Sequence, residues 1–222
     1  MPQTLKGSAA VALDGNAYVL GGYNGANGRN EIWSYNPETN TFTTKNAKLT
    51  KYLYSASATI INKKIYIFGG RTDGSMAGIL TISQCYDPLT DTLTQTANMS
   101  RSYDSAAVTL DNKAYIFGGY SDSIYCYDAD SNSFSRKGEL ILSQSSAVVI
   151  NNKAYIIGGK DSSAVNTILR YDANGDVLTT ESATLASARF GTSAVSLNNR
   201  GFVFGGYNGK LTPDIQILVL PE

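Results

Sequence analysis

The chain of 222 residues contains no histidine, and this absence excludes several kinds of chemistry. Ser-His-Asp and Cys-His nucleophiles, His-ligated zinc or copper, and an imidazole pH switch all need a residue that the chain lacks. Cysteine is scarce as well, because two cysteines are too few for a disulfide framework. The sequence therefore shows no recognisable catalytic constellation, and we expect a protein that is not an enzyme and needs no cofactor or metal.

A second absence is that of net charge. The chain has 18 Lys and Arg residues against 18 Asp and Glu residues, so it has no excess of positive charge to attract nucleic acid or an anionic membrane. No apolar run approaches the roughly 20 residues needed to cross a bilayer. Residues 1–6 also lack the charged-then-apolar layout of a signal peptide. We expect neither nucleic-acid binding nor membrane insertion, and the compartment stays open.

Glycine, in contrast, is plentiful and periodic. An aromatic residue lies three positions before each Gly-Gly doublet, and a pair of turn-forming residues such as Asp14-Gly15 lies seven positions before it. Because Asn, Asp and Gly tolerate positive φ, these pairs predict two-residue turns between two strands, here named a and b. The doublets begin at Gly21, Gly69, Gly118, Gly158 and Gly205.

A second hairpin, of strands c and d, follows each doublet at a variable distance. Its first strand carries a Tyr, and a large apolar residue follows seven positions later, as in Tyr35 and Phe42. Four short strands per unit, repeated every 40 to 49 residues, indicate a β-propeller. A helical solenoid is excluded, since no segment sustains a 3.6-residue periodicity. The recurring strand-c tyrosines are Tyr35, Tyr86, Tyr127 and Tyr171.

These strings resemble the kelch repeat over nearly the whole chain. The resemblance rests on the doublets, the aromatic before each, Tyr86-Asp87-Pro88 with its relatives, and the Arg that opens units three and five (Arg101, Arg189). It implies an all-β propeller of five kelch-type blades with four antiparallel strands per blade. By spacing, Val219 takes the place of Tyr35, so the last blade should have three strands. We expect one domain over residues 1–222, with units at 7–48, 54–98, 103–141, 144–184 and 190–222.

How such a ring closes is left open by the sequence. One prediction is a short pairing of residues 2–6 with the last blade. The alternatives are a fragment of a larger kelch domain and a chain that borrows an edge strand from a neighbour.

The residue directly after each doublet is the main candidate for binding a ligand. A purely structural position should hold one residue type, but this one holds the aromatics and cations that dominate binding hot spots. The resemblance to peptide-binding kelch domains implies that it faces a pocket formed by the b–c and d–a loops. It also implies a pocket-facing Arg at Arg189, whereas Arg101 lies one position out of that register. The predicted pocket residues are Tyr23, Arg71, Tyr120, Lys160, Arg189 and Tyr207.

Charge differs between the loop sets. The d–a crossovers contain seven cations and three acids, whereas the c–d turns contain seven acids and no cation. Because these loop sets lie at opposite ends of a propeller, the pocket end should be mildly basic and favour an acidic partner. The competing interpretation is an ordinary balance of solvated charge. The crossover cations are Lys45, Lys48, Lys51, Arg101, Arg136, Lys137 and Arg189.

Other motifs have plainer interpretations. The Gly-rich stretches lack the Lys-Ser/Thr of a phosphate-binding loop, so we interpret the doublets as places where a side chain cannot fit. The run from Asp172 to Asp176 imitates a calcium loop but lacks its Gly at the sixth position and Glu at the twelfth. Cys85 and Cys126 occupy equivalent places in adjacent units, too far apart to bridge, and should be free thiols.

Three functional hypotheses remain. The first is a non-enzymatic protein-interaction module that binds a partner peptide or loop in the predicted pocket. The second is a carbohydrate-binding or sialic-acid-mutarotase-like kelch protein, which as an enzyme would need a loop carboxylate with a raised pKa. The third is a structural spacer within a larger protein. The loop carboxylates open to the second hypothesis are Glu31, Asp73, Asp104, Asp122, Asp161, Glu181 and Asp214.

Overall fold

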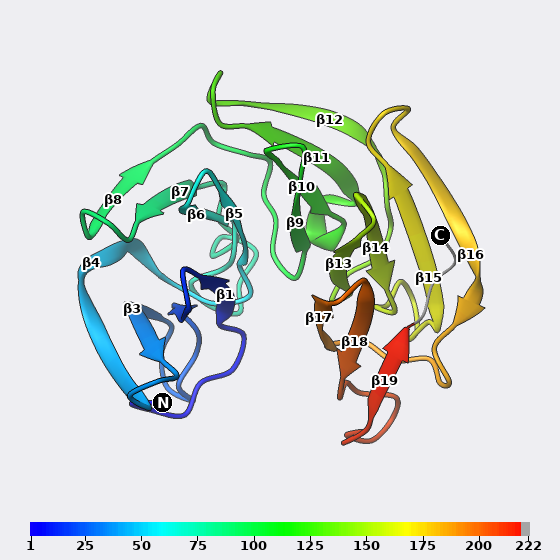
Figure 1. The fold of residues 1–222 in the computed structure, drawn as a ribbon, viewed down its shortest axis with the longest axis horizontal. Helices are drawn as coiled ribbons and strands as arrows, with labels where there is room; N and C mark the ends of the chain where they lie inside the picture. Colours follow the sequence, from blue (N-terminus) through cyan, green and yellow to red (C-terminus); the bar gives the residue numbers. More distant parts are fainter. Residues whose placement is uncertain (219–222) are drawn as a thin grey trace. The chain divides into compact units, whose positions relative to one another are not determined.

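The computed structural model describes residues 1–218 as five antiparallel sheets. Four sheets have four strands each and the fifth has three, so the fold is the predicted all-β, five-bladed propeller with a three-stranded last blade (Figure 1). The chain divides into two compact units. The first contains residues 1–103 and 128–134, and the second contains the rest. No helix within the described part of the chain is long and apolar enough to cross a membrane.

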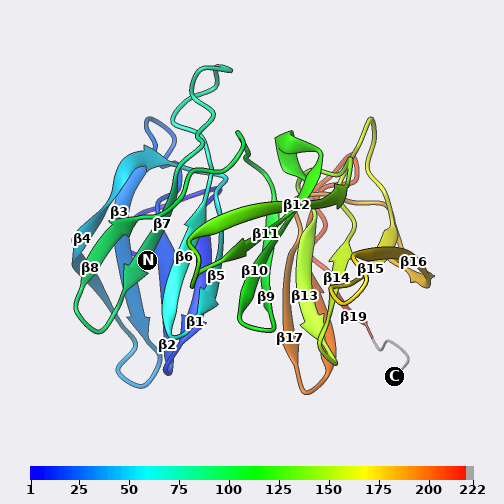
Figure 2. The same ribbon diagram turned by 90° about the horizontal axis from the view of Figure 1, so that it is seen from above.

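The first unit contains blades one and two. In each blade the strands follow one another across the sheet in chain order, with only antiparallel pairs. The β6–β7 connection projects beyond the ends of these strands (Figure 2). Blade one is β1 (Ala9–Leu13), β2 (Asn16–Leu20), β3 (Arg29–Asn36) and β4 (Thr41–Leu53), and blade two is β5 (Ser57–Ile61), β6 (Lys64–Phe68), β7 (Ser83–Asp87) and β8 (Thr92–Gln95).

The second unit contains most of blade three and all of blades four and five. A single turn of 3-10 helix, η1 (Gly119–Ser121), interrupts the third blade after its doublet. Blade three is β9 (Ala106–Leu110), β10 (Lys113–Phe117), β11 (Ser123–Asp128) and β12 (Ser133–Glu139). Blade four is β13 (Ser146–Ile150), β14 (Lys153–Ile157), β15 (Thr167–Asp172) and β16 (Val177–Thr184), and blade five is β17 (Ser193–Leu197), β18 (Arg200–Phe204) and β19 (Ile215–Leu218).

The predicted hairpin turns are confirmed. Both central residues of each a–b turn have positive φ, for example 47° at Asp14 and 77° at Gly15, or 48° at Asn151 and 56° at Asn152. Two successive positive φ angles define the turn whose twist matches the flanking strands.

Two details of the prediction are wrong. Leu218 lies opposite Gly201, as Tyr35 lies opposite Ala17, so Leu218 takes the place assigned to Val219 by spacing. The reason is a b–c connection one residue shorter in blade five than in blade one. Val219 itself lies outside the described residues.

The second correction concerns the basic crossover. Lys45, Lys48 and Lys51 lie on β4 and not in a loop, because this strand continues to Leu53. Register shifts opposite Arg29 and Glu31 absorb the extra residues of β4.

The interpretation of the glycine doublets is confirmed. The first glycine has φ near +60°, and a Cβ added to it would lie 2.6 Å from the Leu53 carbonyl oxygen at Gly21 and 2.0 Å from the Leu142 carbonyl oxygen at Gly118. In both cases that oxygen belongs to the approach of the next blade. The N–H of the second glycine donates to the same oxygen, over 2.8 Å from Gly22 to Leu53. The doublets at Gly21, Gly69, Gly118 and Gly158 are therefore close main-chain contacts that exclude a side chain, whereas at Gly205 the nearest atom is a carbonyl oxygen of the same blade, 3.3 Å away.

A second main-chain contact links successive blades through the residue two positions before each strand a. All five of these residues have positive φ. Within the first unit the Ser55 N–H donates to the Gly7 carbonyl over 2.7 Å, and within the second the Gln144 and Gly191 N–H groups donate to the carbonyls of Asp104 and Gln144 over 2.8 Å. The five residues are Gly7, Ser55, Asp104, Gln144 and Gly191.

Repeated tyrosines pack between blades, as predicted. The ring centroids of Tyr18 in blade one and Tyr86 in blade two lie 6.1 Å apart, and those of Tyr115 in blade three and Tyr171 in blade four 5.4 Å apart. All four side chains are buried. The strand-b tyrosine of one blade therefore contacts the strand-c tyrosine of the next.

The c–d turns carry a latch that sequence reasoning missed. The hydroxyl groups of Tyr86 and Tyr171 donate to Asp91 and Asp176, five residues later, over 2.9 Å and 2.6 Å. The same carboxylates also hold the outer strand of the preceding blade: Asp91 accepts the Asn46 N–H over 2.9 Å, and Asp176 accepts Lys137 Nζ over 3.1 Å. These turn acids therefore stabilise the fold.

Candidate binding rows

In blades one, two, four and five, the residue after the doublet forms an antiparallel bridge with the residue three positions before strand a of its own blade, and a second bridge with a residue of its b–c loop. The former bridges join Lys6 to Tyr23 and Tyr54 to Arg71 in the first unit, and Ser143 to Lys160 and Phe190 to Tyr207 in the second. The antiparallel pairing of strands a and b thus continues for one more residue pair beyond the doublet. Main-chain pairing therefore sets the position of the backbone that carries each of these side chains, whatever the residue type.

In the first unit these side chains form one continuous row. Lys6 Nζ lies 5.2 Å from the ring centroid of Tyr23, and the rings of Tyr23 and Tyr54 lie 5.3 Å apart. The Arg71 guanidinium lies 5.8 Å from the ring of Tyr54 and 4.6 Å from that of Tyr103. We call Lys6, Tyr23, Tyr54, Arg71 and Tyr103 the first row. It brings together the two predicted site residues of this unit, Tyr23 and Arg71.

The second unit has a shorter row of the same kind. Lys160 Nζ lies 4.7 Å from the ring centroid of Phe190, whose ring lies 5.4 Å from that of Tyr207. We call Lys160, Phe190 and Tyr207 the second row. Tyr120 is placed differently, because it lies in η1, where its side chain is 42% exposed.

Arg189 does not offer an accessible guanidinium. Its side chain is 2% exposed and donates to the Gly205 carbonyl over 3.2 Å, to Ser187 Oγ over 2.8 Å and to Asp214 over 2.9 Å. All of these partners belong to its own blade or to the approach to it. In place of the orientation implied by the kelch resemblance, the buried Arg189 guanidinium pairs with the exposed Asp214 carboxylate of the fifth blade.

Sequence reasoning found two of the five residues of the first row and two of the three residues of the second. The missed members are those that precede strand a, among them Lys6, Tyr54, Tyr103 and Phe190. A signal was present, since this position holds one cation and three aromatic residues, with a serine only in blade four. The pattern is hard to see because the d–a crossover varies in length, although this position keeps a fixed distance from strand a.

The row cations differ from the other basic residues in their partners. Arg136, Lys137 and Arg189 form ion pairs with Glu139, Asp176 and Asp214. Within residues 1–218, in contrast, Lys6, Arg71 and Lys160 form no ion pair and lie against aromatic rings, and Arg71 Nε also donates to the Asp73 carbonyl over 2.7 Å. Their charge thus remains available to an anionic ligand.

Four of the loop carboxylates show the opposite of what a general acid would need. Burial raises the pKa of Glu31, but hydrogen bonds from Arg29 and from the main chain outweigh it and leave the pKa below its usual range. The pKa of Asp214 is lowered by the hydrogen bond from Arg189, that of Asp73 by hydrogen bonds from Ser75, and that of Asp161 by those from Ser163 and Ser162. Each of these four groups is held in the ionised form.

The remaining sequence motifs serve structure. Asp172 accepts Lys153 Nζ over 2.5 Å, and Asp176 is engaged by Tyr171 and Lys137, so the calcium-like run is an ordinary turn. No cluster of three or more potential metal ligands occurs among residues 1–218. Both cysteines are buried and free, as predicted.

Blades of four antiparallel strands, joined at glycine doublets with a buried tyrosine three positions earlier, define a kelch-repeat β-propeller. The family model described as Attractin/LZTR1 beta-propeller matches residues 2–216, and the chain belongs to that family.

Individual relatives match over shorter stretches. An F-box/kelch-repeat protein of Arabidopsis thaliana is 32% identical over 95 residues, which cover 42% of this chain and 20% of the relative. Kelch-like protein 6 of Homo sapiens is 36% identical over 67 residues, which cover 30% of this chain and 11% of that protein. The matches thus span a fifth or less of these curated relatives.

The solved structure of YjhT is similar in fold. It superposes with a TM-score of 0.81 at 16% sequence identity, covering 96% of this chain and 81% of that one. At this identity the likeness supports the propeller architecture alone.

Proposed function

We propose that this chain is a non-enzymatic protein-interaction module, and that it binds an acidic peptide or loop of a partner through the residues after its doublets. Membership of the kelch family supports the general role. The observation that carries the finer proposal is the pair of cation–aromatic rows, whose cations lie against rings and have no carboxylate partner among the described residues. The proposed contacts are Tyr23, Arg71, Tyr120, Lys160 and Tyr207.

Such a row suits peptide recognition for two physical reasons. Aromatic rings contribute a large contact area at a small cost in side-chain entropy, and the Arg guanidinium adds several hydrogen-bond donors in a fixed planar geometry; both are enriched in hot spots. Cations that touch no protein carboxylate attract an acidic segment over a distance and speed its association. The lowered pKa values of Glu31, Asp73, Asp161 and Asp214 count against a mutarotase-like enzyme, which needs a carboxyl group with a raised pKa.

The test is a peptide array with acidic, neutral and basic sets, followed by titration of the peptides that bind. The wild type should select acidic peptides, with affinity that falls as salt rises. Arg71→Gln should weaken binding about tenfold or more, the loss expected for a moderate hot spot. Lys63→Gln is the matched control, because it removes one charge from the a–b turn before β6, whereas Arg71 follows the doublet after β6. Equal affinity of Arg71→Gln and wild type would refute the proposal.

A further inference from the structure

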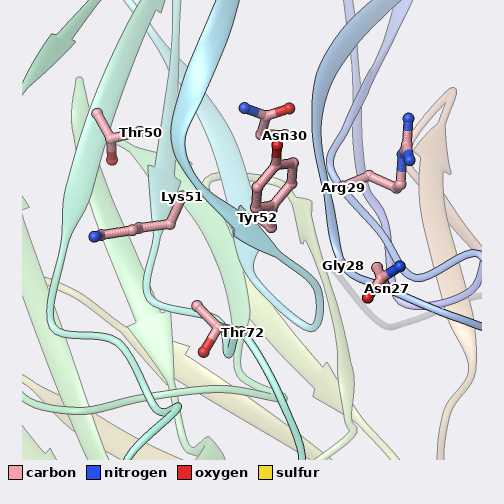
Figure 3. A pocket seen from close by; sticks show the side chains of 8 residues that line it. All are labelled: Asn27, Gly28, Arg29, Asn30, Thr50, Lys51, Tyr52 and Thr72. Atoms are coloured by element: carbon pink, nitrogen blue, oxygen red, sulfur yellow. The ribbon is translucent and has the colours of Figure 1, made fainter.

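A groove in the first unit lies between the b–c loop of blade one and the end of β4 (Figure 3). Lys51 and Tyr52 in this groove are successive residues of β4, so their side chains point to opposite sides of the strand and do not face one ligand. The second unit offers a more coherent surface. On the side of blade five that is turned away from blade four, apolar side chains share one face of one sheet.

The apolar surface of blade five comes from all three of its strands. Side chains of a strand alternate between its two faces, and Val203 and Leu218 pack against blade four. The residues between them therefore point to the other face, where cross-strand pairing sets Val195 beside Phe202 and Phe202 beside Ile217. The open face, as we call it, consists of Val195, Leu197, Phe202, Phe204, Ile215 and Ile217.

The described part of the chain leaves this open face largely uncovered. Leu197 and Ile215 are each 60% exposed, and Val195 is 53% exposed. Half of the large hydrophobic side chains that are exposed among residues 1–218 lie between positions 195 and 217. Apolar residues that adjoin in this way mark an interaction site, whereas exposed apolar residues scattered singly are normal. Leu197 and Phe202 also line a hollow of about 280 Å³ that can receive a side chain of the partner.

The equivalent positions are buried in the two preceding blades of the second unit. Each of these side chains is at most 6% exposed, because it packs on the next blade. The open face therefore has the composition of a contact between blades and lacks only the sheet that would cover it. The equivalent residues are Val108, Leu110, Tyr115 and Phe117 in blade three and Val148, Ile150, Tyr155 and Ile157 in blade four.

A contact between blades also needs a receiving face, which is the face that a blade turns toward the blade before it. In blades two and four this face carries the strand-c tyrosines Tyr86 and Tyr171, which are fully buried against the preceding blade. The equivalent Tyr35 of blade one is only half-buried, and Ala10 and Ala12 on the same face are exposed. Blade one thus has a receiving face that is still open.

The receiving face supplies the small residues that large side chains need opposite them. Ala147 and Ala154 of blade four pack in the same cluster as Tyr115 of blade three. In blade one the equivalent positions are Ala10 and Ala17. Large and small side chains interdigitate, whereas two faces that both carry large side chains leave voids between them. The open face therefore fits the receiving face of blade one better than it fits a second open face.

From this repetition we infer that blade five of one copy of the chain binds blade one of a second copy, with the open face packed on the receiving face that carries Tyr35. Phe202 then takes the place that Tyr18 and Tyr115 hold against the tyrosine of the next blade. Because the two surfaces differ, the contact is heterologous and joins the copies head to tail. The open face contains none of the proposed peptide contacts, so this inference does not depend on the proposed function.

Analytical ultracentrifugation over a range of protein concentrations tests the inference. The mean mass of the wild type should rise above that of one chain, at high salt as well, because the contact is apolar. Ile217→Lys on the open face and Ala10→Lys on the receiving face should each raise the dissociation constant at least tenfold, since either variant puts an unpaired charge into the contact. Because both residues are exposed, circular dichroism should show the wild-type fold in both variants.

A mixture of the two variants gives the sharpest measurement. Each variant retains one intact surface, so an equimolar mixture should form a one-to-one complex and nothing larger. Val177→Lys is the matched control and should leave the association unchanged, because Val177 is as exposed as Ile217, at 52%, but lies on the outer strand of blade four.

Two results would overturn the inference. One is a wild type that stays monomeric at every concentration. The other is wild-type association of Ala10→Lys, because the open faces would then bind each other. Neither result bears on the peptide titration with Arg71→Gln, so the two proposals fail separately.

Discussion

Replacing the first glycine of a doublet separates two reasons for its presence. Gly118 and Gly205 both have φ of +62°, so alanine suffers the same backbone strain at either site. That strain amounts to roughly 1–2 kcal/mol. The sites differ in what a Cβ would meet. At Gly118 it lies 2.0 Å from the Leu142 carbonyl oxygen, whereas at Gly205 its nearest neighbour, the Thr212 carbonyl oxygen, is 3.3 Å away.

The added cost at Gly118 follows from that clash. The Leu142 carbonyl must move, at an overpacking cost of about 1–3 kcal/mol. It then also loses the 2.7 Å hydrogen bond from the Gly119 N–H, worth about 1 kcal/mol. Gly118→Ala should therefore lower the free energy of unfolding by about 3–6 kcal/mol and Gly205→Ala by about 1–2 kcal/mol.

Urea denaturation followed by far-ultraviolet circular dichroism measures both variants against the wild type. Because both glycines belong to the second unit, the same transition reports on each. Equal losses in the two variants would show that φ alone requires glycine, and would refute the contact with the next blade as its cause.

Three further predictions concern the turn acids and the thiols. Asp91→Ala should lower the free energy of unfolding by about 2–4 kcal/mol, because a charged acceptor of four hydrogen bonds is lost, whereas Glu38→Ala in the equivalent turn of blade one should change it by less than about 0.5 kcal/mol. Burial raises the pKa of Asp91 but hydrogen bonds from Asn46, Tyr86 and Ala47 outweigh it, so the net pKa is lowered. Ionised Asp91 should then contribute its full stability above its unfolded pKa of about 4, and this stability should be lost as the pH falls through the lower pKa of the folded state. The urea midpoint of Asp91→Asn should therefore depend less on pH than that of the wild type. Cys85 and Cys126 are buried, and burial raises the pKa of Cys85, so a thiol reagent should label neither in the native protein and both in urea; rapid native labelling would contradict the packing.

The fold was predictable because its strongest constraints act on residue type. A doublet that excludes Cβ atoms must be glycine, and a turn with two positive φ angles favours Asn, Asp and Gly, so both leave a periodic trace. The latch at Asp91 and Asp176 leaves one too, since Asn or Asp follows each strand-c tyrosine by five positions. It was overlooked because the turn acids were read as surface charge.

Other contacts leave no trace because they involve only the main chain. The residues that link blades two positions before strand a are Gly, Ser, Asp, Gln and Gly, and nothing in their side chains announces the shared conformation. Arg189 illustrates the opposite difficulty. Its place in the sequence matches a pocket position, but its direction depends on Asp214 and Ser187, at distances along the chain that no repeat specifies.

The same distinction explains how such a scaffold can carry different ligand sites. Beside the tyrosine and carboxylate contacts, several contacts that join blades run from N–H to carbonyl, as from Ser55 to Gly7 and from Gln144 to Asp104. The side chains of Tyr54 and Arg71 start from a bridge that main-chain atoms alone make. Substitution there changes recognition while the groups that hold the blades together remain in place. At these bridge residues, main-chain atoms contribute to stability and side-chain atoms to recognition. We therefore expect Arg71→Gln to alter binding and to leave the unfolding transition unchanged.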